Sequence, residues 1–397
     1  MYMECGLQKI FLQLENLECI QSGNYVLKSG KVSKYYFDMR MIISNPTLLK
    51  EIGDLIYQSL DDFDILCAIP NGGMPIATYI SVTYNKPMIY VRDKAKEYGS
   101  KKQIEGRFNK DDKCVIIDDV MTSGKSIVDA YNILKDVVNV QQCSVIMDRQ
   151  ECTKELPVCV KSIFTKTDYT RYQLLKFTRE KNSNFIFSGD VSCPVQLLEL
   201  LRKVGPFIVV CKLHLDCIEF SETTMSFENF KSELIDLSVE DRYLLMEDRK
   251  YVDISSIVEQ QYKSISSWVD LVTVHGSVNP EVVSKLSGVV LVSNMSNNEW
   301  NYDRETKYMS RIYSNRVIGF VTQYDLQPPA IGNNILVQMT PGISKCSKKE
   351  GDQNYKTPES LETDYMIVGR AVYYAKEPVE TIKEYLQDAM TNIHRLR

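Results

Sequence analysis

Apolar segments of strand length alternate with helix-like segments through the first 150 residues. The apolar runs end in turn-forming residues, such as the Pro70-Asn71-Gly72-Gly73 stretch. This alternation is typical of an open, mostly parallel α/β sheet. We expect strands over residues 64–69, 87–91, 113–117 and 142–147, and helices over residues 48–60, 74–83 and 127–137.

The rest of the chain carries eight short apolar segments separated by intervals long enough for a helix. Eight β/α units in roughly 230 residues fit a (β/α)₈ TIM barrel. A polar stretch around residues 150–183, with one predicted helix over 169–180, separates the two patterns. We therefore expect two domains, residues 1–160 and residues 161–397. The barrel strands are expected at 185–187, 207–211, 243–247, 271–274, 289–292, 317–322, 335–339 and 365–368.

Polar side chains follow these predicted strands, at the end of a barrel where reactive groups gather. The densest group is Glu247–Ile254. Side chains alternate along a strand, so Asp248 and Lys250 point to one face, and Asp253 follows in the turn. Such charges are costly to desolvate unless they pair or take part in chemistry. This stretch is therefore our first candidate site.

Composition narrows the class of protein. The 397 residues, 44% hydrophobic and 25% charged, indicate a soluble globular protein. A net charge of −5 with interspersed lysines gives no reason to expect nucleic-acid binding. We expect no membrane span and no secretory signal. Eleven scattered cysteines without a CxxC pair indicate reduced thiols and a cytoplasmic location. The three histidines argue against a histidine metal site or a Ser-His-Asp triad, and we interpret His214 and His275 as supporting residues.

A strand followed by two acids and a small-residue loop stands out in the first domain. Asp118 and Asp119 can accept hydrogen bonds from ribose hydroxyls. The loop then offers hydroxyls and backbone N–H groups to a phosphate at a helix N-terminus. It lacks the upstream glycine and spacing of a Walker A loop. The run resembles the phosphoribosyl-pyrophosphate (PRPP) motif of type I phosphoribosyltransferases, whose ligand positions here are Asp118, Asp119, Thr122, Ser123, Gly124, Lys125 and Ser126.

Three further segments resemble orotate phosphoribosyltransferases. They are Arg92–Gly99 with Lys101–Gly106, which resemble a mobile catalytic loop, Tyr25–Gly30 with Tyr36–Asp38, and Asp148–Glu151. The resemblance implies that Lys96 and Arg92 neutralise the leaving pyrophosphate, that Mg²⁺ bridges this pyrophosphate, and that orotate is held by Lys28, Phe37 and Arg149. Asp93 departs from the family, because a second basic residue usually stands there.

The second domain resembles orotidine 5′-phosphate decarboxylases, through the Asp-x-Lys-x-x-Asp core of Asp248, Lys250 and Asp253 with Lys212 upstream. The resemblance implies a charged array in which Lys250 protonates C6 of the pyrimidine, with no cofactor, and Asp253 acts across a dimer interface. A carbanion-like transition state is stabilised by an ammonium group held between carboxylates.

The same resemblance implies the contacts to the rest of the substrate. Asp190 joins Lys212 at the ribose hydroxyls, Ser296 contacts the pyrimidine edge, and the 5′-phosphate is held by Gln353, Tyr355, Gly369 and Arg370. Two segments depart from the family, Ser255-Ser256-Ile257 in place of Gly-Asn-Thr and Asn297–Trp300 in place of Gly-Ser-Leu-Ala.

Together the two domains resemble the bifunctional uridine monophosphate synthases, with the transferase first. This implies synthesis of UMP from orotate and PRPP through orotidine 5′-monophosphate, by a homodimer or higher homo-oligomer. Two alternatives stay open: only the decarboxylase site works, given Asp93, or the chain is a catalytically silent nucleotide-binding regulator. Retention of the charged groups, including Lys96 and Lys250, argues against the regulator.

Overall fold

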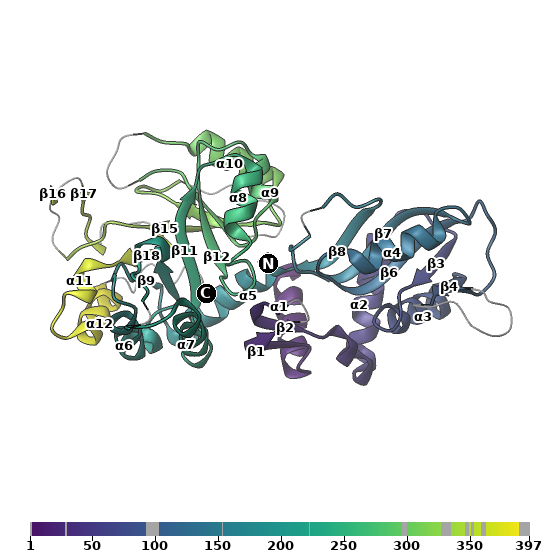
Figure 1. The fold of residues 1–397 in the computed structure, drawn as a ribbon, viewed down its shortest axis with the longest axis horizontal. Helices are drawn as coiled ribbons and strands as arrows, with labels where there is room; N and C mark the ends of the chain where they lie inside the picture. Colours follow the sequence, from purple (N-terminus) through teal and green to yellow (C-terminus); the bar gives the residue numbers. More distant parts are fainter. Residues whose placement is uncertain are drawn as a thin grey trace. The chain divides into compact units, whose positions relative to one another are not determined.

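In the computed structural model the chain forms two compact units, shown as ribbons in Figure 1. One unit comprises Cys5–Gln21 and Tyr36–Lys166, and the other comprises Met1–Glu4, Ser22–Tyr35 and Thr167–Arg397. The predicted junction at residue 160 falls inside strand β8, because the residues that follow it still pair with β7. The structure describes residues 2–27, 30–92, 103–152, 154–221, 223–295, 300–326, 335–345, 349–350, 353–358 and 363–388.

The first unit is built on a six-stranded sheet in the order β5-β4-β3-β6-β7-β8. Its strands run parallel except β5, which is antiparallel to β4. The strands are β3 (Ile65–Ala68), β4 (Met88–Val91), β5 (Ile104–Glu105), β6 (Lys113–Met121), β7 (Asn139–Asp148) and β8 (Cys159–Thr165). The mostly parallel sheet confirms the predicted fold class of this part. The sequence pattern missed β8, whose residues are only partly apolar.

Helices connect β3 to β4 and β6 to β7, as expected for parallel β/α units. Pro46 and the Asn45 side chain, which accepts a hydrogen bond from Leu48 N, fix the start of the helix that precedes β3. The helices are α1 (Tyr2–Asn16), the 3₁₀ turn η1 (Met39–Ser44), α2 (Pro46–Ser59), α3 (Gly73–Tyr84) and α4 (Lys125–Leu134). Apolar residues of α4 and the central strands share one core.

The second unit contains a closed barrel of eight parallel strands in the order β10-β11-β12-β13-β14-β15-β18-β9, as the sequence predicted. The strands are β9 (Phe185–Ser188), β10 (Val210–Leu213), β11 (Leu244–Tyr251), β12 (Leu271–His275), β13 (Val289–Val292), β14 (Val317–Val321), β15 (Val337–Thr340) and β18 (Tyr365–Val368). A short antiparallel pair, β16 (Lys349–Glu350) and β17 (Gln353–Asn354), precedes β18.

The barrel has two apolar cores, as its layered architecture requires. One fills the interior and includes Ile186, Leu244 and Val290, whereas the other lies between strands and helices. The helical elements are α5 (Lys166–Lys181), α6 (Pro194–Val204), η2 (Gly205–Phe207), η3 (Leu215–Cys217), α7 (Phe227–Glu240), α8 (Ser255–Tyr262), α9 (Glu281–Ser284), α10 (Asp303–Ile312), α11 (Arg370–Tyr373) and α12 (Pro378–Asp388). None of the helices within the described ranges combines the length and apolar content needed to span a bilayer.

A hairpin from the N-terminal part of the sequence packs on the barrel. It consists of β1 (Ile20–Val26) and β2 (Val32–Phe37). Lys34 Nζ lies 2.6 Å from Asp270 Oδ2, and the Tyr35 hydroxyl donates to Asp270 Oδ1 at 2.6 Å. Both side chains of the ion pair are buried, and Leu245 N also donates to Asp270 Oδ2. The hairpin is therefore joined to the amino-terminal ends of β11 and β12.

Candidate active sites

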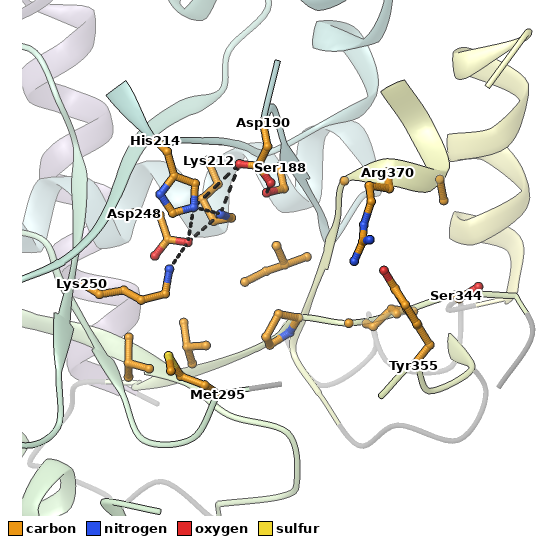
Figure 2. A pocket seen from close by; sticks show the side chains of 18 of the residues that line it. Ser188, Asp190, Lys212, His214, Asp248, Lys250, Met295, Ser344, Tyr355 and Arg370 are labelled. Carbon is orange, nitrogen blue, oxygen red and sulfur yellow. Dashed lines mark hydrogen bonds and ion pairs between the residues drawn. The ribbon is translucent and has the colours of Figure 1, made fainter. Parts of the chain in front are cut away.

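A cavity of about 670 Å³ opens at the carboxyl ends of the barrel strands. Figure 2 shows charged side chains on one side of it and Arg370 with Tyr355 on the other. Residues from β9, β10, β11 and the segments after β15 and β18 line it. The polar lining residues are Ser188, Asp190, Lys212, His214, Asp248, Lys250, Ser344, Tyr355, Arg370 and Tyr374.

Asp248 is the centre of the charged side of the cavity. Its Oδ2 lies 2.6 Å from Lys212 Nζ, 3.0 Å from Lys250 Nζ and 3.3 Å from His214 Nε2. Dashed lines mark these interactions in Figure 2. The structure thus brings together Lys212, Asp248 and Lys250, which the sequence places on two different strands.

The electrostatics of this cluster follow from burial and charge. Burial disfavours the Asp248 carboxylate, yet the cations around it prevail, Lys212 first, and hold its pKa well below the usual range. Burial likewise disfavours the Lys212 ammonium, but the charges of Asp248 and Asp190 outweigh it and raise the pKa of this lysine. Both groups are therefore ionised at neutral pH, although their side chains are only 8% exposed.

The preceding residue, Glu247, behaves in the opposite way. Burial raises its pKa to about 7, opposed by the hydrogen bond that its carboxylate accepts from Leu215 N at 3.2 Å. Glu247 is 2% exposed and is not among the cavity-lining residues. The pKa of Glu247 is thus raised above the usual value for a carboxyl group and that of its neighbour Asp248 is lowered below it, because among the described residues cations contact only Asp248.

Asp190 lies next to the cluster, as the sequence predicted for a strand-end residue. Its Oδ1 is 3.9 Å from Lys212 Nζ and 3.8 Å from His214 Nε2, and its Oδ2 accepts from Ser188 Oγ at 2.8 Å. This carboxylate is 40% exposed. A hydroxyl-bearing ligand in the cavity can therefore reach Asp190 and Lys212 together.

The opposite side of the cavity is cationic and aromatic. The Arg370 guanidinium lies over the Tyr355 ring, 5.6 Å from its centroid. A Cβ at Gly369 would lie 3.1 Å from Ser188, so a side chain is hard to accommodate there. Gln353 lies in β17, but its side chain is outside the described part of the structure, and Ser296 is outside it altogether.

Asp253 lies apart from the cavity. It is exposed, and its Oδ1 accepts only a local hydrogen bond from Ile254 N at 2.7 Å among the contacts described. Its neighbours Val252 and Ile254 are each 65% exposed. Within this chain, the structure does not bring Asp253 to the Lys212–Asp248–Lys250 cluster.

Three further residues of this region lie close to the predicted ones. His214, which we interpreted as a supporting residue, lines the cavity and contacts Asp248. Ser188 and Thr273 were not singled out, although Thr273 Oγ1 donates to Asp248 Oδ1 at 2.8 Å. Their positions in the sequence could have identified them, because each lies near the carboxyl end of a barrel strand.

The first unit holds a separate acidic site on β6. The predicted strand ended at Ile117, but pairing with β7 continues through Met121, so Asp118 and Asp119 lie within the strand. Burial and the charge of Asp119 raise the pKa of Asp118 to about 8. A Cβ at Gly72 would fall 2.1 Å from Asp119 Cγ, so the Pro70–Gly73 turn lies against the acidic pair.

The predicted phosphate loop follows these acids. Thr122, Ser123, Lys125 and Ser126 are exposed. Gly124 has φ +74° and begins α4 without a side-chain cap. The first N–H groups of a helix lack internal partners, so this N-terminus offers donors to an anion.

The other predicted transferase residues are only partly described. Arg149 pairs with Glu151 at 2.6 Å, and its guanidinium lies 5.4 Å from the centroid of the Phe37 ring. Arg92 pairs with Glu105 at 2.9 Å. Lys28 and Lys96 lie outside the described residues. Among described side chains, no group of three or more metal-ligating residues is positioned to hold an ion alone.

Comparison with known proteins assigns both parts of the chain. The model of the orotidine 5′-phosphate decarboxylase / HUMPS family matches residues 183–385, and that of the phosphoribosyl transferase domain matches residues 39–173. The chain therefore belongs to the orotidine 5′-phosphate decarboxylase / HUMPS family and carries a phosphoribosyl transferase domain before its barrel.

Individual relatives cover either the whole chain or one domain. Uridine 5′-monophosphate synthase of Bos taurus is 27% identical, with 95% of each chain covered. Orotate phosphoribosyltransferase of Methanocaldococcus jannaschii is 38% identical over 37% of this chain and 85% of its own length. Orotidine 5′-phosphate decarboxylase of Pichia kudriavzevii is 29% identical over 54% of this chain and 89% of its own. The similarity to the bovine synthase thus spans both matched domains of this chain.

Proposed function

We propose that this chain makes uridine 5′-monophosphate from orotate in two steps. The first unit transfers phosphoribosyl from PRPP to orotate, releasing pyrophosphate, and the barrel decarboxylates the resulting orotidine 5′-monophosphate. The observation that carries the proposal is the array of buried Lys212 and Asp248 with half-buried Lys250 at the cavity. Similarity to whole-length synthases supports the joining of both activities.

In the decarboxylation, Lys250 is the proton donor. As the C6–carboxylate bond breaks and carbon dioxide leaves, the electron pair stays on C6, and the Lys250 ammonium supplies the proton there. Asp248 holds this ammonium 3.0 Å from its Oδ2 and lies against the substrate carboxylate. A preorganised cation at a developing carbanion lowers the barrier without a cofactor.

The remainder of the substrate is held by groups around the cavity. Lys212 and Asp190 bind the ribose hydroxyls, and Ser296 contacts the pyrimidine edge. Arg370, Tyr355, Gln353 and the Gly369 backbone bind the 5′-phosphate. Contacts remote from the reacting bond can supply binding energy that is expressed at the transition state.

In the transfer step, the residues of the acidic site bind PRPP. Asp118 and Asp119 accept hydrogen bonds from the ribose hydroxyls, and the exposed hydroxyls and N–H groups of residues 122–126 bind the 5′-phosphate. Orotate is held by Lys28, Arg149 and Phe37, of which Arg149 and Phe37 already lie together. Arg92 and Lys96 offset the charge that builds on pyrophosphate as the C1 bond breaks.

The acidic pair of β6 would hold Mg²⁺ together with PRPP. A hard cation takes oxygen ligands and is commonly held by one or two carboxylates plus substrate phosphates. The acidic pair of β6 is chemically suited to that arrangement. When bound, the ion would neutralise charge on the pyrophosphate.

The working form is a homodimer or higher homo-oligomer in the cytoplasm. Exposed Asp253 between exposed Val252 and Ile254 supports an interface, at which Asp253 would complete the partner's charged array. Buried free thiols such as Cys67 and Cys143 support a reducing compartment.

The experiment uses the purified full-length chain with orotate, PRPP and Mg²⁺, and follows orotate and UMP by chromatography. Lys250→Ala should abolish decarboxylation, so that orotidine 5′-monophosphate accumulates while transfer continues. A wild type that accumulates this intermediate would refute the decarboxylase assignment. A wild type that decarboxylates supplied orotidine 5′-monophosphate but leaves orotate untouched would refute the transferase assignment.

A further inference from the structure

Strand β11 is irregular where its catalytic residues lie. Glu247 is in register with Val272 of β12, and Tyr251 is in register with Val274, so β11 carries two extra residues between these pairs. Lys250 lies in this irregular segment with φ +52°, a left-handed conformation that non-glycine residues adopt only at a cost. Something in the surroundings must therefore hold Lys250 in place.

Thr273 of β12 supplies that support. Lys250 N donates to Thr273 Oγ1 at 2.9 Å. The same hydroxyl donates to Asp248 Oδ1 at 2.8 Å. Thr273 is 0% exposed and is not a cavity-lining residue. Its hydroxyl thus joins the backbone of the proposed proton donor to the carboxylate that holds its ammonium.

The direction of these two bonds is fixed. A backbone N–H can only donate, so Thr273 Oγ1 must accept from Lys250 and has its single proton left for Asp248. Asp248 then has Oδ1 bound by this hydroxyl, while Oδ2 faces Lys212 and Lys250. The position between Lys250 N and Asp248 Oδ1 requires one atom that both accepts and donates a hydrogen bond. A methyl group cannot replace the Thr273 hydroxyl in this role.

We propose that Thr273 is a positioning residue of the decarboxylase, which sets the Lys250 backbone and the Asp248 carboxylate through one hydroxyl. This inference rests on the proposed function. Thr273 acts through its neighbours, so its loss should impair the chemical step more than substrate binding. The ribose and phosphate contacts arise from other elements, among them β9, β10 and the segment after β18.

The test compares Thr273→Val, which keeps the side-chain shape, with Thr273→Ser, which keeps the hydroxyl. In full-length protein supplied with orotidine 5′-monophosphate, Thr273→Val should lower kcat about 10²-fold, as expected for misplaced catalytic groups. KM should change by less than about threefold, because the variant keeps the contacts that bind the substrate equally in the ground state and the transition state. Thr273→Ser should restore most of kcat, and the affinity for UMP measured by calorimetry should stay near that of the wild type in both variants.

Thr178→Val is the matched control. Thr178 is buried in α5, and its hydroxyl bonds Leu174 O at 2.8 Å and the Tyr365 hydroxyl at 2.9 Å, away from the charged cluster. The Thr178→Val variant should retain the wild-type kcat. The role of Thr273 is refuted if the wild type is active and Thr273→Val is unimpaired. It is also refuted if Thr273→Ser is as slow as Thr273→Val. A wild type that does not decarboxylate at all refutes the proposed function instead.

Discussion

The buried ion pair between the hairpin and the barrel allows a quantitative test of how the barrel is stabilised. Lys34→Met removes the ammonium but keeps an apolar side chain of similar length. Asp270 would then keep the Tyr35 hydroxyl and Leu245 N as donors but lose its counter-charge. The two side chains are 3% and 0% exposed, so water cannot take the place of the lysine.

The expected cost follows from this burial. Removing one partner of a buried pair typically destabilises a protein by about 3–5 kcal/mol, because the other charge stays buried and uncompensated. For a unit of this size each kcal/mol lowers Tm by about 2–4 °C, which gives a decrease of roughly 6–20 °C. Asp270→Asn in the Lys34→Met background should recover part of the loss, since the buried charge is then gone.

Tryptophan fluorescence is a suitable assay, because both tryptophans of the chain, Trp268 and Trp300, belong to the barrel unit. Thermal and urea unfolding of the full-length chain followed this way report on that unit. The barrel transition can then be analysed separately from unfolding of the first unit, which a single two-state treatment of the whole chain would not allow.

A matched surface pair provides the control. Arg202 Nη2 and Glu233 Oε2 are also 2.6 Å apart, but their side chains are 49% and 42% exposed. Arg202→Met should cost no more than about 1 kcal/mol, because exposed pairs are weak. The reasoning fails if Lys34→Met is as stable as this control. It also fails if the double variant with Asp270→Asn loses as much stability as the two single variants lose together.

Two further predictions concern the two sites. Gly72→Ala should raise the KM for PRPP about tenfold or more, equivalent to about 1.4 kcal/mol, because the new Cβ would displace Asp119. Unchanged transfer kinetics would contradict this, and decarboxylation serves as the internal control. The pKa of Glu247 is raised from 4.5 to about 7, so its contribution to stability is complete below pH 4.5 and is lost as the pH rises through 7. In urea unfolding, the wild type should therefore lose up to ~3 kcal/mol of stability between pH 4.5 and pH 7, and Glu247→Gln should not show this loss. Plots of stability against pH that run parallel for the wild type and the variant would refute the assignment.

Sequence patterns predicted the larger features of the fold for a physical reason. Strands of a parallel barrel are buried on both faces, so they are continuous apolar runs that stand out from amphipathic helices. The predicted ranges of β13 and β18 agree with the structure. The strand β8 was missed because its edge position leaves several residues only partly buried, as in the segment from Cys159 to Ser162.

The irregularity of β11 could not be predicted from sequence. The alternation rule placed Asp248 and Lys250 on one face, but the predicted strand ended at Glu247 and the structure continues it to Tyr251. The two extra residues depend on how β11 pairs with β12. That pairing, and with it the bonds to Thr273, exists only when the barrel is closed.

The sequence by itself determined the two-domain α/β organisation, the family resemblance and which residue types could carry the chemistry, because these depend on local periodicity and on motif spacing. Only the tertiary structure decided which groups meet. It joined Lys212 to Asp248 across two strands, placed His214 at the cavity, and left Asp253 exposed within the single chain. It also paired Lys34 with Asp270, which are 236 residues apart in sequence. Contacts between residues distant in sequence depend on packing the whole chain, and the environment of each charge is fixed only when that packing excludes water.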